Sequence, residues 1–290
     1  MLPGMAVKPR VAIVGAGNLG SVLALALLRA GYAIEAVVAR SRGESRTRAH
    51  GLAKQVGARA VTDLSTVCAA LIWFCVPDSE IARSARSLAG KVGWRGRVAL
   101  HSSGALTSDE LVVLRRRGAA VASVHPLMTF VRGSRPSLAG VPFALEGDAA
   151  AVRVARRLVR DLGGRAYPIA KKEKAAYHAW GTFASPLFTA LLATSERVAG
   201  LARVTRKAAR QRMIPILLQT LANYAAFGAA GAFSGPLVRG DVDTVTRHLR
   251  ALRGTPAARK VYLGLARAAL HYLPVKNKNS LKRILDSSRD

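Results

Sequence analysis

The fold is decided by residues 11–31, which read VAIVGAGNLGSVLALALLRAG. Residues 11–14 are four apolar residues in a row, a pattern typical of a parallel strand buried on both faces. The helical pattern of residues 19–30 follows and ends at Gly31. Gly15, Gly17 and Gly20 lie between the two and form the spacing GxGxxG. The stretch therefore predicts a strand, a glycine turn and a helix.

Each glycine of this turn has a separate use in a dinucleotide-binding site. The first lets the chain turn sharply, the second lets the backbone approach a pyrophosphate, and the third lets the helix pack closely on the strand. The start of the helix directs free N–H groups and its positive dipole end at the phosphate. Because the motif directly follows a strand and opens a helix, we interpret it as a dinucleotide-binding turn rather than a structural one. The cofactor contacts expected here are Gly15, Ala16, Gly17, Asn18, Leu19 and Gly20.

The end of the second predicted strand, residues 33–39, indicates which nucleotide binds. NAD-binding folds usually end this strand with an acidic residue that holds the ribose 2′-hydroxyl. Here the strand is followed by Arg40, Ser41 and Arg42, and Glu35 lies early in the strand, away from its carboxyl end. Guanidinium groups and a hydroxyl suit a 2′-phosphate, which a carboxylate would repel. The sequence therefore predicts NADP(H) rather than NAD, the alternative being a solvated turn with incidental arginines.

Three further strands deliver polar residues to the same edge of the predicted sheet. The strand at residues 71–76 is closed by Pro77 and Asp78, and we expect Val76, Pro77 and Asp78 beside the cofactor, although Asp78 also suits a helix cap. Strands at residues 97–100 and 119–124 lead to His101-Ser102-Ser103-Gly104 and to His125-Pro126. Ligands bind outside the carboxyl ends of parallel strands, so both histidines are predicted to line one crevice.

The pattern changes after residue 169, which divides the chain into two predicted domains. A strand at 141–145, a helix at 148–162 and a strand at 166–169 complete an α/β Rossmann domain over residues 1–169. Residues 170–290 lack strand-like alternation and predict an all-α domain for substrate binding and dimerisation. Residues 175–195 and 213–233 contain no Asp, Glu, Lys or Arg. We interpret them as helices buried by a partner subunit rather than as membrane spans, because they contain His178, Pro186, Pro215 and Gly228.

Composition narrows the class of protein. Half of the 290 residues are hydrophobic, which excludes a disordered chain. Two cysteines, Cys68 and Cys75, make neither a disulfide framework nor a metal-ligand spacing, and with no secretion signal they indicate the cytoplasm. The net charge of +29 suits a polyanion partner, but the arginines are spread over the chain without a nucleic-acid module. We expect neither a specific nucleic acid, nor a membrane, nor a metal.

Six motifs in order resemble one family. They are GAGNLG at 15–20, CVPD at 75–78, HSSGAL at 101–106, HPLMTF at 125–130, KAAYHAWGTFAS at 174–185 and GPLVRGDVDTVTRHL at 235–249. The chain resembles a branch of the 6-phosphogluconate dehydrogenase and pyrroline-5-carboxylate reductase superfamily. In that branch a Rossmann-like domain is joined to a C-terminal helical domain of unknown function, and its members are labelled NADP or deazaflavin-dependent oxidoreductases.

The resemblance implies where the reaction would occur. It places the nicotinamide and a small polar substrate in a cleft between the domains of a homodimer, and the surplus of cationic groups favours an anionic substrate. It makes Lys174 or His178, one turn apart on the first long helix, the proton donor to a carbonyl or imine, with deazaflavin as another hydride partner. His101, Ser102 and Ser103 would orient the reacting group, His125 would join them, and Arg239 and Asp241 would come from the partner.

One position departs from the family pattern. Pro186 stands where the branch usually has Asn, which removes an amide from the helix and also a backbone donor. A nucleotide-binding sensor that has lost turnover is therefore the second hypothesis, and a polyanion-binding protein that uses the basic surface is the third.

Overall fold

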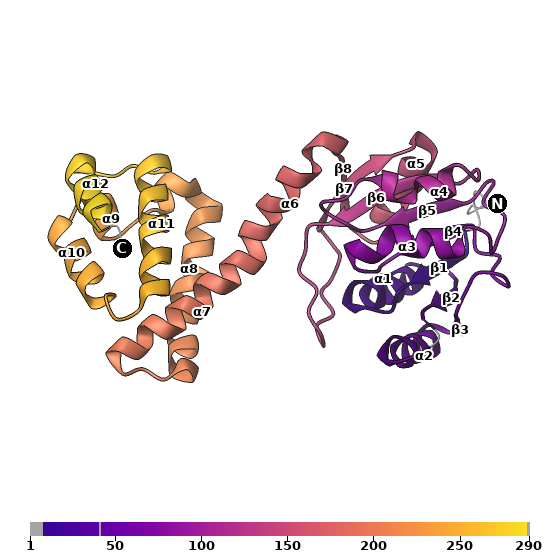
Figure 1. Ribbon diagram of the computed structural model, residues 1–290, viewed down its shortest axis with the longest axis horizontal. Helices are drawn as coiled ribbons and strands as arrows, with labels where there is room; N and C mark the ends of the chain where they lie inside the picture. The colour runs from indigo at the N-terminus through magenta and orange to yellow at the C-terminus, as the bar shows by residue number, and fades with distance from the viewer. Residues whose placement is uncertain (1–7, 41, 289–290) are drawn as a thin grey trace, which may run out of the picture. The chain divides into compact units, whose positions relative to one another are not determined.

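The computed structural model describes residues 8–40 and 42–288. The chain forms two compact units, Met1–Thr182 and Phe183–Asp290, and Figure 1 labels the elements of each. The predicted residue Ser41 lies outside the described residues.

The first unit is built on an eight-stranded sheet. Its strands are ordered β3-β2-β1-β4-β5-β6-β7-β8, and every neighbouring pair is parallel except β6 and β7. The six parallel strands form the doubly wound arrangement in which the strand order reverses between β1 and β4. The strands are β1 (Val11–Val14), β2 (Ile34–Val38), β3 (Arg59–Val61), β4 (Leu71–Phe74), β5 (Val98–His101), β6 (Ala120–Pro126), β7 (Pro142–Gly147) and β8 (Arg165–Pro168).

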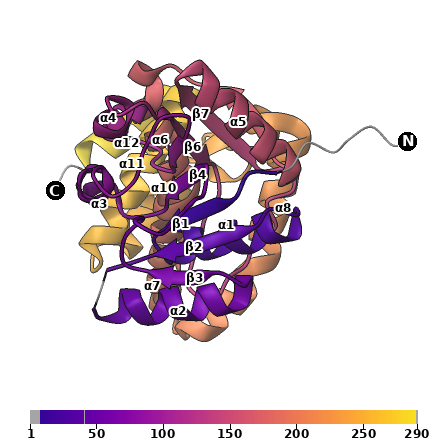
Figure 2. The same cartoon turned by 90° about the vertical axis from the view of Figure 1, so that its right-hand side faces the viewer.

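Helices cover both faces of this sheet and bury its apolar side chains. One hydrophobic cluster joins the strands to α1 (Asn18–Arg29), α2 (Glu44–Val56) and α5 (Ala149–Asp161). A second cluster, on the other face, joins them to α3 (Asp78–Leu88), the 3₁₀ turn η1 (Ser108–Leu111) and α4 (Val112–Arg115). Figure 2 shows β1, β2 and β3 side by side with α1 and α2. The predicted Rossmann architecture is confirmed.

The strand ends differ from prediction in one respect that matters for the site. His101 is the last residue of β5, and His125 lies inside β6 rather than after it. The backbone of both residues is therefore held by the strand pairing of the sheet, not by a loop. The chain continues beyond β8 through η2 (Lys171–Glu173) into α6 (Lys174–Thr182), which ends the first unit.

The second unit is entirely helical in its described residues. Its small core joins α10 (Val242–Ala251), α11 (Pro256–Tyr272) and α12 (Lys278–Ser287) through Val245, Leu249, Leu263, Leu270 and Leu281. Pro186, which has no backbone N–H, lies in a π-helical turn, a place where the regular ladder is already interrupted. The elements are η3 (Phe183–Leu187), α7 (Phe188–Ala199), η4 (Gly200–Ala202), α8 (Arg206–Ala232), α9 (Pro236–Arg239), α10 (Val242–Ala251), α11 (Pro256–Tyr272) and α12 (Lys278–Ser287).

Helix α8 is apolar and exposed within the single chain. Ile216, Leu218 and Phe227 are each more than 60% exposed. The stretch Arg206–Arg239, which comprises α8 and α9, is long and apolar enough to cross a membrane, and none of its apolar window is buried. Gly228 breaks the helix with a φ of 68°, so the backbone ladder is interrupted within that stretch.

Candidate functional site

The glycine turn after β1 has the tight geometry that its spacing predicts. Gly15 has a φ of +102°, and a Cβ there would lie 2.6 Å from Cys75 O. A Cβ on Gly20 would overlap Gly15 O, so the helix approaches the turn as closely as the backbone permits. A Cβ on Gly17 would meet nothing nearer than 3.9 Å, which leaves room above this residue. The three glycines therefore shape the turn in the manner of a phosphate-binding loop.

The first turn of α1 presents donors to that space. Gly17 is the N-cap, and no side chain among the described residues caps the helix or places an acid in its first turn. The side chain of Asn18 donates to Phe130 O at 3.1 Å and so points away from the turn. Unpaired N–H groups at a helix start favour an anion.

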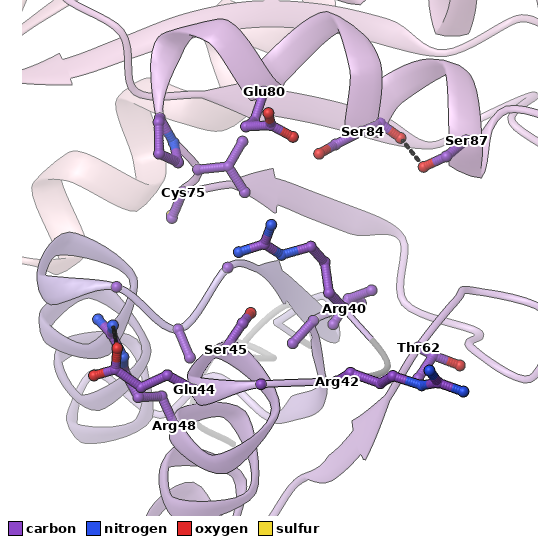
Figure 3. Close-up of a pocket in the computed structure, with 18 of the residues that line it drawn as sticks. Arg40, Arg42, Glu44, Ser45, Arg48, Thr62, Cys75, Glu80, Ser84 and Ser87 are labelled. Carbon is purple, nitrogen blue, oxygen red and sulfur yellow. Dashed lines mark hydrogen bonds and ion pairs between the residues drawn. The ribbon is translucent and has the colours of Figure 1, made fainter.

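A pocket of about 640 Å³ opens beside the turn, between the ends of β2 and β4 (Figure 3). Figure 3 shows Arg40 extending into the pocket toward α3, whereas Arg42 turns toward Thr62 at its edge. No hydrogen bond or ion pair joins either guanidinium to another described residue. The lining also includes Gly15, Ala16, Gly17, Glu44, Ser45, Arg48, Val76, Pro77, Glu80, Ser84 and Ser87.

The acidic residues near this pocket are already paired. Glu44 binds Arg48 at 2.8 Å and Glu80 binds Arg83 at 3.2 Å. Glu35, on β2, accepts from the backbone N–H of Cys68 and from Arg59 and does not line the pocket. The pocket therefore offers a free cation, Arg40, at the position where an NAD site has its carboxylate.

Asp78 links the pocket beside the glycine turn to the residues that follow β5. It is the first residue of α3, and its carboxylate accepts from Ser103 Oγ at 2.8 Å instead of capping the helix. Val76 and Pro77 precede it along the pocket wall.

Ser103 is the centre of a buried hydrogen-bond network at the end of β5. Its N–H donates to His101 Nδ1 at 3.1 Å, and its hydroxyl accepts from the N–H of Leu106. Its carbonyl oxygen accepts from Lys174 Nζ at 3.0 Å and from Ser123 Oγ at 3.1 Å. All of the polar atoms of Ser103 are therefore used to hold the turn at residues 102–104. Ser102, the neighbour, accepts from Trp73 Nε1 at 2.8 Å.

His101 has a fixed protonation state in this network. Nδ1 accepts from Ser103 N–H, so Nε2 carries the proton and donates to Thr107 O at 2.9 Å. The side chain is fully buried, and burial lowers its pKa to about 4. His101 is thus a neutral imidazole with both nitrogens occupied.

Lys174 reaches the same turn from α6. The residue is fully buried, and Nζ donates to Ser103 O and, at 2.7 Å, to Ser123 Oγ. Burial lowers its pKa to about 8, against the charges of Glu146 and Asp78, which raise it. The ammonium is therefore retained at neutral pH and is directed at the protein rather than at open space.

His125 and His178 lie together on the other side of the turn. His125 Nδ1 is 2.9 Å from Tyr177 Oη, and its ring centroid is 6.0 Å from that of His178, at 83°. A Cβ on Gly104 would lie 2.8 Å from His125 Nε2 and 2.5 Å from His178 Cδ2. The structure thus brings Lys174 and His178 to one turn, as their spacing predicts, with Lys174 buried and His178 exposed.

Two residues of this site were missed in the sequence. Tyr177 lies in an apolar run whose pattern predicts a buried helix, and only its contact with His125 distinguishes it from a core aromatic residue. Gly104 follows Ser102 and Ser103, and the sequence analysis assigned a role to those two hydroxyls and none to the glycine.

The remaining predicted residues lie in the second unit. Arg239 ends α9, and Asp241 caps α10 by accepting from the N–H of Thr244 at 3.1 Å. In the part of the chain that the structure describes, no three potential ligands gather as a metal site.

Comparison with families of known sequence gives two matches. Residues 5–126 match the family described as a Rossmann-like domain, and residues 141–269 match DUF2520, a domain of unknown function. No curated protein matches the chain.

Solved structures share this arrangement at low identity. A candidate NADP oxidoreductase from Bacteroides fragilis is 24% identical, with a TM-score of 0.75 over 90% of this chain and 97% of that one. An imine reductase from Pseudomonas sp. is 22% identical, with a TM-score of 0.65 over 96% and 100%. A reductive aminase from Aspergillus terreus in complex with NADPH and ethyl-5-oxohexanoate is 15% identical, with a TM-score of 0.67 over 96% and 100%. These likenesses show the fold.

Proposed function

Because the chain carries a Rossmann-like domain followed by a DUF2520 domain, we propose that it is an NADP(H)-dependent oxidoreductase. It transfers a hydride to or from a small polar carbonyl or imine compound. The observation that carries the proposal is the pocket beside the glycine turn, where Arg40 is unpaired among the described residues and takes the place of an acid. The structural relatives that bind NADPH or are named for NADP support the same cofactor.

Different residues of the first unit would hold different parts of this nucleotide. The turn at Gly15 to Gly20 and the start of α1 would hold the pyrophosphate, and Arg40 would hold the 2′-phosphate. Val76 and Pro77 would lie along the nucleotide at the end of β4. When bound, the nicotinamide supplies or accepts the hydride. We propose NADP(H) rather than a deazaflavin, because the guanidinium of Arg40 in the pocket would suit a 2′-phosphate.

The protein groups divide into two sets by what they face. His125 and His178 pack against Gly104 with their ring edges, and they are the groups proposed to contact the substrate. His101, Ser103 and Lys174 use their polar atoms in hydrogen bonds within the protein and are proposed to hold the turn rigid. A rigid support is what a reacting group needs if its geometry is to be kept within a fraction of an ångström.

Calorimetric titration with NADPH and NADH tests the proposal directly. We expect NADPH to bind at least tenfold more tightly than NADH. Arg40→Glu should remove this preference by weakening NADPH alone, since a carboxylate repels the 2′-phosphate. Arg42→Glu is the matched control, because Arg42 turns toward Thr62 and its replacement should change the preference less. Equal loss of both nucleotides in Arg40→Glu would contradict the 2′-phosphate role.

The sensor hypothesis remains the alternative, and Pro186 is the feature that favours it. The same protein should therefore be incubated with NADPH and panels of aldehydes, ketones and cyclic imines while absorbance at the reduced nicotinamide band is followed. Turnover of any class supports the oxidoreductase. Tight NADPH binding with no turnover would favour the sensor.

We also propose that a second copy of the chain covers α8. Its apolar side chains are exposed in the single chain, and a lipid surface suits it poorly. The break at Gly228 would leave backbone groups without partners in hydrocarbon, where they are costly. Sedimentation should give a dimer, and Leu218→Glu with Phe227→Glu should give a monomer. Val112→Glu, an exposed apolar position of the first unit, is the control that should remain dimeric.

A further inference from the structure

A second pocket, of about 410 Å³, lies between α1, α2 and the loop at residues 131–135. It shares Ala16, Gly17 and Arg48 with the pocket between β2 and β4, but no residue of β4 or α3 lines it. Arg40, the residue proposed to hold the 2′-phosphate, does not line it either. Its volume is within the range of pockets that hold small molecules. The proposed function therefore leaves this pocket without a ligand.

Two helices form its walls, each with one stripe of residues. The residues in each stripe are spaced i, i+3, i+4 and i+7, so they lie on one face of their helix. The stripes are Asn18, Ser21, Val22 and Leu25 of α1 and Arg48, Gly51, Leu52 and Gln55 of α2. Val22, Leu25 and Leu52 form an apolar floor, of which Val22 and Leu52 are buried. The remaining members of the stripes surround this floor with polar groups and a glycine.

Gly51 widens the pocket on the α2 side. It lies in the interior of α2, where glycine is less stable than alanine by about 1 kcal/mol. Its φ is not positive, and a Cβ at this position would meet nothing within 4 Å. Neither the backbone nor the packing of α2 therefore requires glycine here, and its effect is to leave room in the pocket.

The loop that covers the pocket is fastened at both ends. The side chain of Asn18, on α1, donates to Phe130 O at 3.1 Å. Arg135 Nη2 donates to Gln55 Oε1, on α2, at 3.4 Å. Between these two attachments, a backbone hydrogen bond of 3.1 Å closes a turn over residues 131–134. The pocket is therefore enclosed by parts of the chain that are bonded to one another.

The charge of the lining selects an anion. Three guanidinium groups and no carboxylate line the pocket among the residues that the structure describes. Arg48 pairs with Glu44 at 2.8 Å (Figure 3), and Arg135 bonds only to the neutral amide of Gln55. Arg132 forms no hydrogen bond or ion pair with another described residue. Like charges around one space repel one another, and a phosphate group would offset this with up to two negative charges and three acceptor oxygens.

We propose that this second pocket binds a small molecule that carries a phosphate group on an apolar body, while the nucleotide occupies the first pocket. Arg132 and Arg135 would hold the phosphate, because guanidinium groups match its oxygens in pairs. The apolar floor would contact the rest of the molecule. Only the simultaneous binding of both ligands rests on the proposed function. Because Gly17 and Arg48 border both pockets, the two ligands would be neighbours.

The first test is calorimetric titration of the NADPH-saturated protein with phenyl phosphate, benzoate and benzyl alcohol. At pH 8 phenyl phosphate is a dianion, and 150 mM KCl screens the exposed surface charges. We expect one equivalent of phenyl phosphate to bind at least tenfold more tightly than benzoate or benzyl alcohol. Equal affinity for benzoate would overturn the assignment to phosphate. Binding that disappears when NADPH is present would assign the pocket to the nucleotide and overturn the proposal.

The test survives failure of the proposed function. If NADPH itself does not bind, the same titration is made without it on Arg40→Gln protein, whose first pocket lacks its unpaired cation. Phenyl phosphate should still bind in a ratio of one to one. Absence of binding there would overturn the second pocket as a phosphate site, separately from the nucleotide.

The second test distinguishes the pocket from general attraction to a basic protein. Arg132→Gln with Arg135→Gln should raise the Kd for phenyl phosphate at least tenfold and leave the Kd for NADPH within threefold. Arg153→Gln with Arg156→Gln is the matched control, because it removes the same charge from exposed positions of α5 outside the lining. The control should change the Kd for phenyl phosphate less than twofold. Equal weakening in the two double variants would contradict a specific site.

The third test fills the pocket without changing its charge. Gly51→Phe places a ring on the α2 stripe and should raise the Kd for phenyl phosphate at least tenfold. Gly51→Ala adds only a methyl group and should remain within threefold of the wild type. Both variants should keep the wild-type Kd for NADPH and a thermal midpoint no lower than that of the wild type. Wild-type affinity for phenyl phosphate in Gly51→Phe would contradict binding between α1 and α2.

Discussion

At the carboxyl ends of β1 and β2 the polar groups face open space, whereas at the end of β5 they are buried against one another. Arg40 and the first N–H groups of α1 have no partner among the described residues. Ser103, His101 and Lys174, by contrast, are buried and bonded within the protein: Ser103 N–H donates to His101, and Lys174 Nζ donates to Ser103 O and Ser123 Oγ. One edge of a single sheet thus contains both an open surface with an unpaired guanidinium and a buried polar support.

Open and buried polar residues at strand ends have different roles. An open group can bind a ligand, and its loss should lower affinity while the fold survives. A buried, satisfied group holds the backbone, and its loss leaves partners unpaired at a cost in stability. Binding and stability measurements on the same variants therefore separate the two parts.

The largest effect on NADPH affinity is expected at Gly20, because the glycine turn beside the open pocket depends on close packing at this residue. Gly20→Ala places a methyl against Gly15 O, so the turn must open, and we expect NADPH to bind about a hundredfold more weakly, or about 3 kcal/mol. Calorimetry measures the loss. Gly51→Ala, in α2 with open space around it, should bind normally and gain up to about 1 kcal/mol of stability. Wild-type affinity in Gly20→Ala would contradict the packing argument.

Removing Lys174, the cation in the buried network at the end of β5, should lower the free energy of unfolding by nearly as much. Lys174→Ala leaves Ser103 O and Ser123 Oγ without their donor, and we expect a loss of about 3 kcal/mol in the free energy of unfolding. Urea denaturation gives the value. Lys171→Ala, on the preceding turn and paired with exposed Asp109, should lose less than about 1 kcal/mol. Similar losses in both variants would show that burial of Lys174 has no special weight.

The sequence predicts the first unit better than it predicts the roles of its polar residues. Apolar runs and glycines give seven of the eight strands, because buried strands have a local apolar pattern. The histidine at the end of β5 looks catalytic by the same rule, yet both of its nitrogens bind backbone atoms. These hydrogen bonds depend on how the chain folds after β5, so the sequence pattern alone does not predict them. Tyr177 was missed for the same reason, since its partner His125 is 52 residues away.

The pH dependence of stability should report the buried histidines. His101 and His125 have pKa values near 4 when folded, against about 6.5 when unfolded, so the unfolded chain takes up their protons first as pH falls. Stability is therefore full above pH 6.5 and decreases toward pH 4, by about 1.4 kcal/mol per pH unit for each histidine. His101→Asn and His125→Asn should each remove one proton from the slope in urea titrations between pH 4.5 and 7. An unchanged slope in either variant would mean that its imidazole is not held neutral.

The smallest expected effect is at Ser102, a predicted catalytic residue whose hydroxyl accepts from the fully buried Trp73 at 2.8 Å. Ser102→Ala leaves the indole N–H unpaired, which should cost about 1–2 kcal/mol of stability. In a Trp73→Phe background the donor is absent, so the same substitution should cost less than about 0.5 kcal/mol. The double-mutant cycle on unfolding free energies therefore measures the pair. Equal costs in the two backgrounds, together with a lowered kcat in Ser102→Ala alone, would move Ser102 from the buried support to the open, substrate-facing part of the edge.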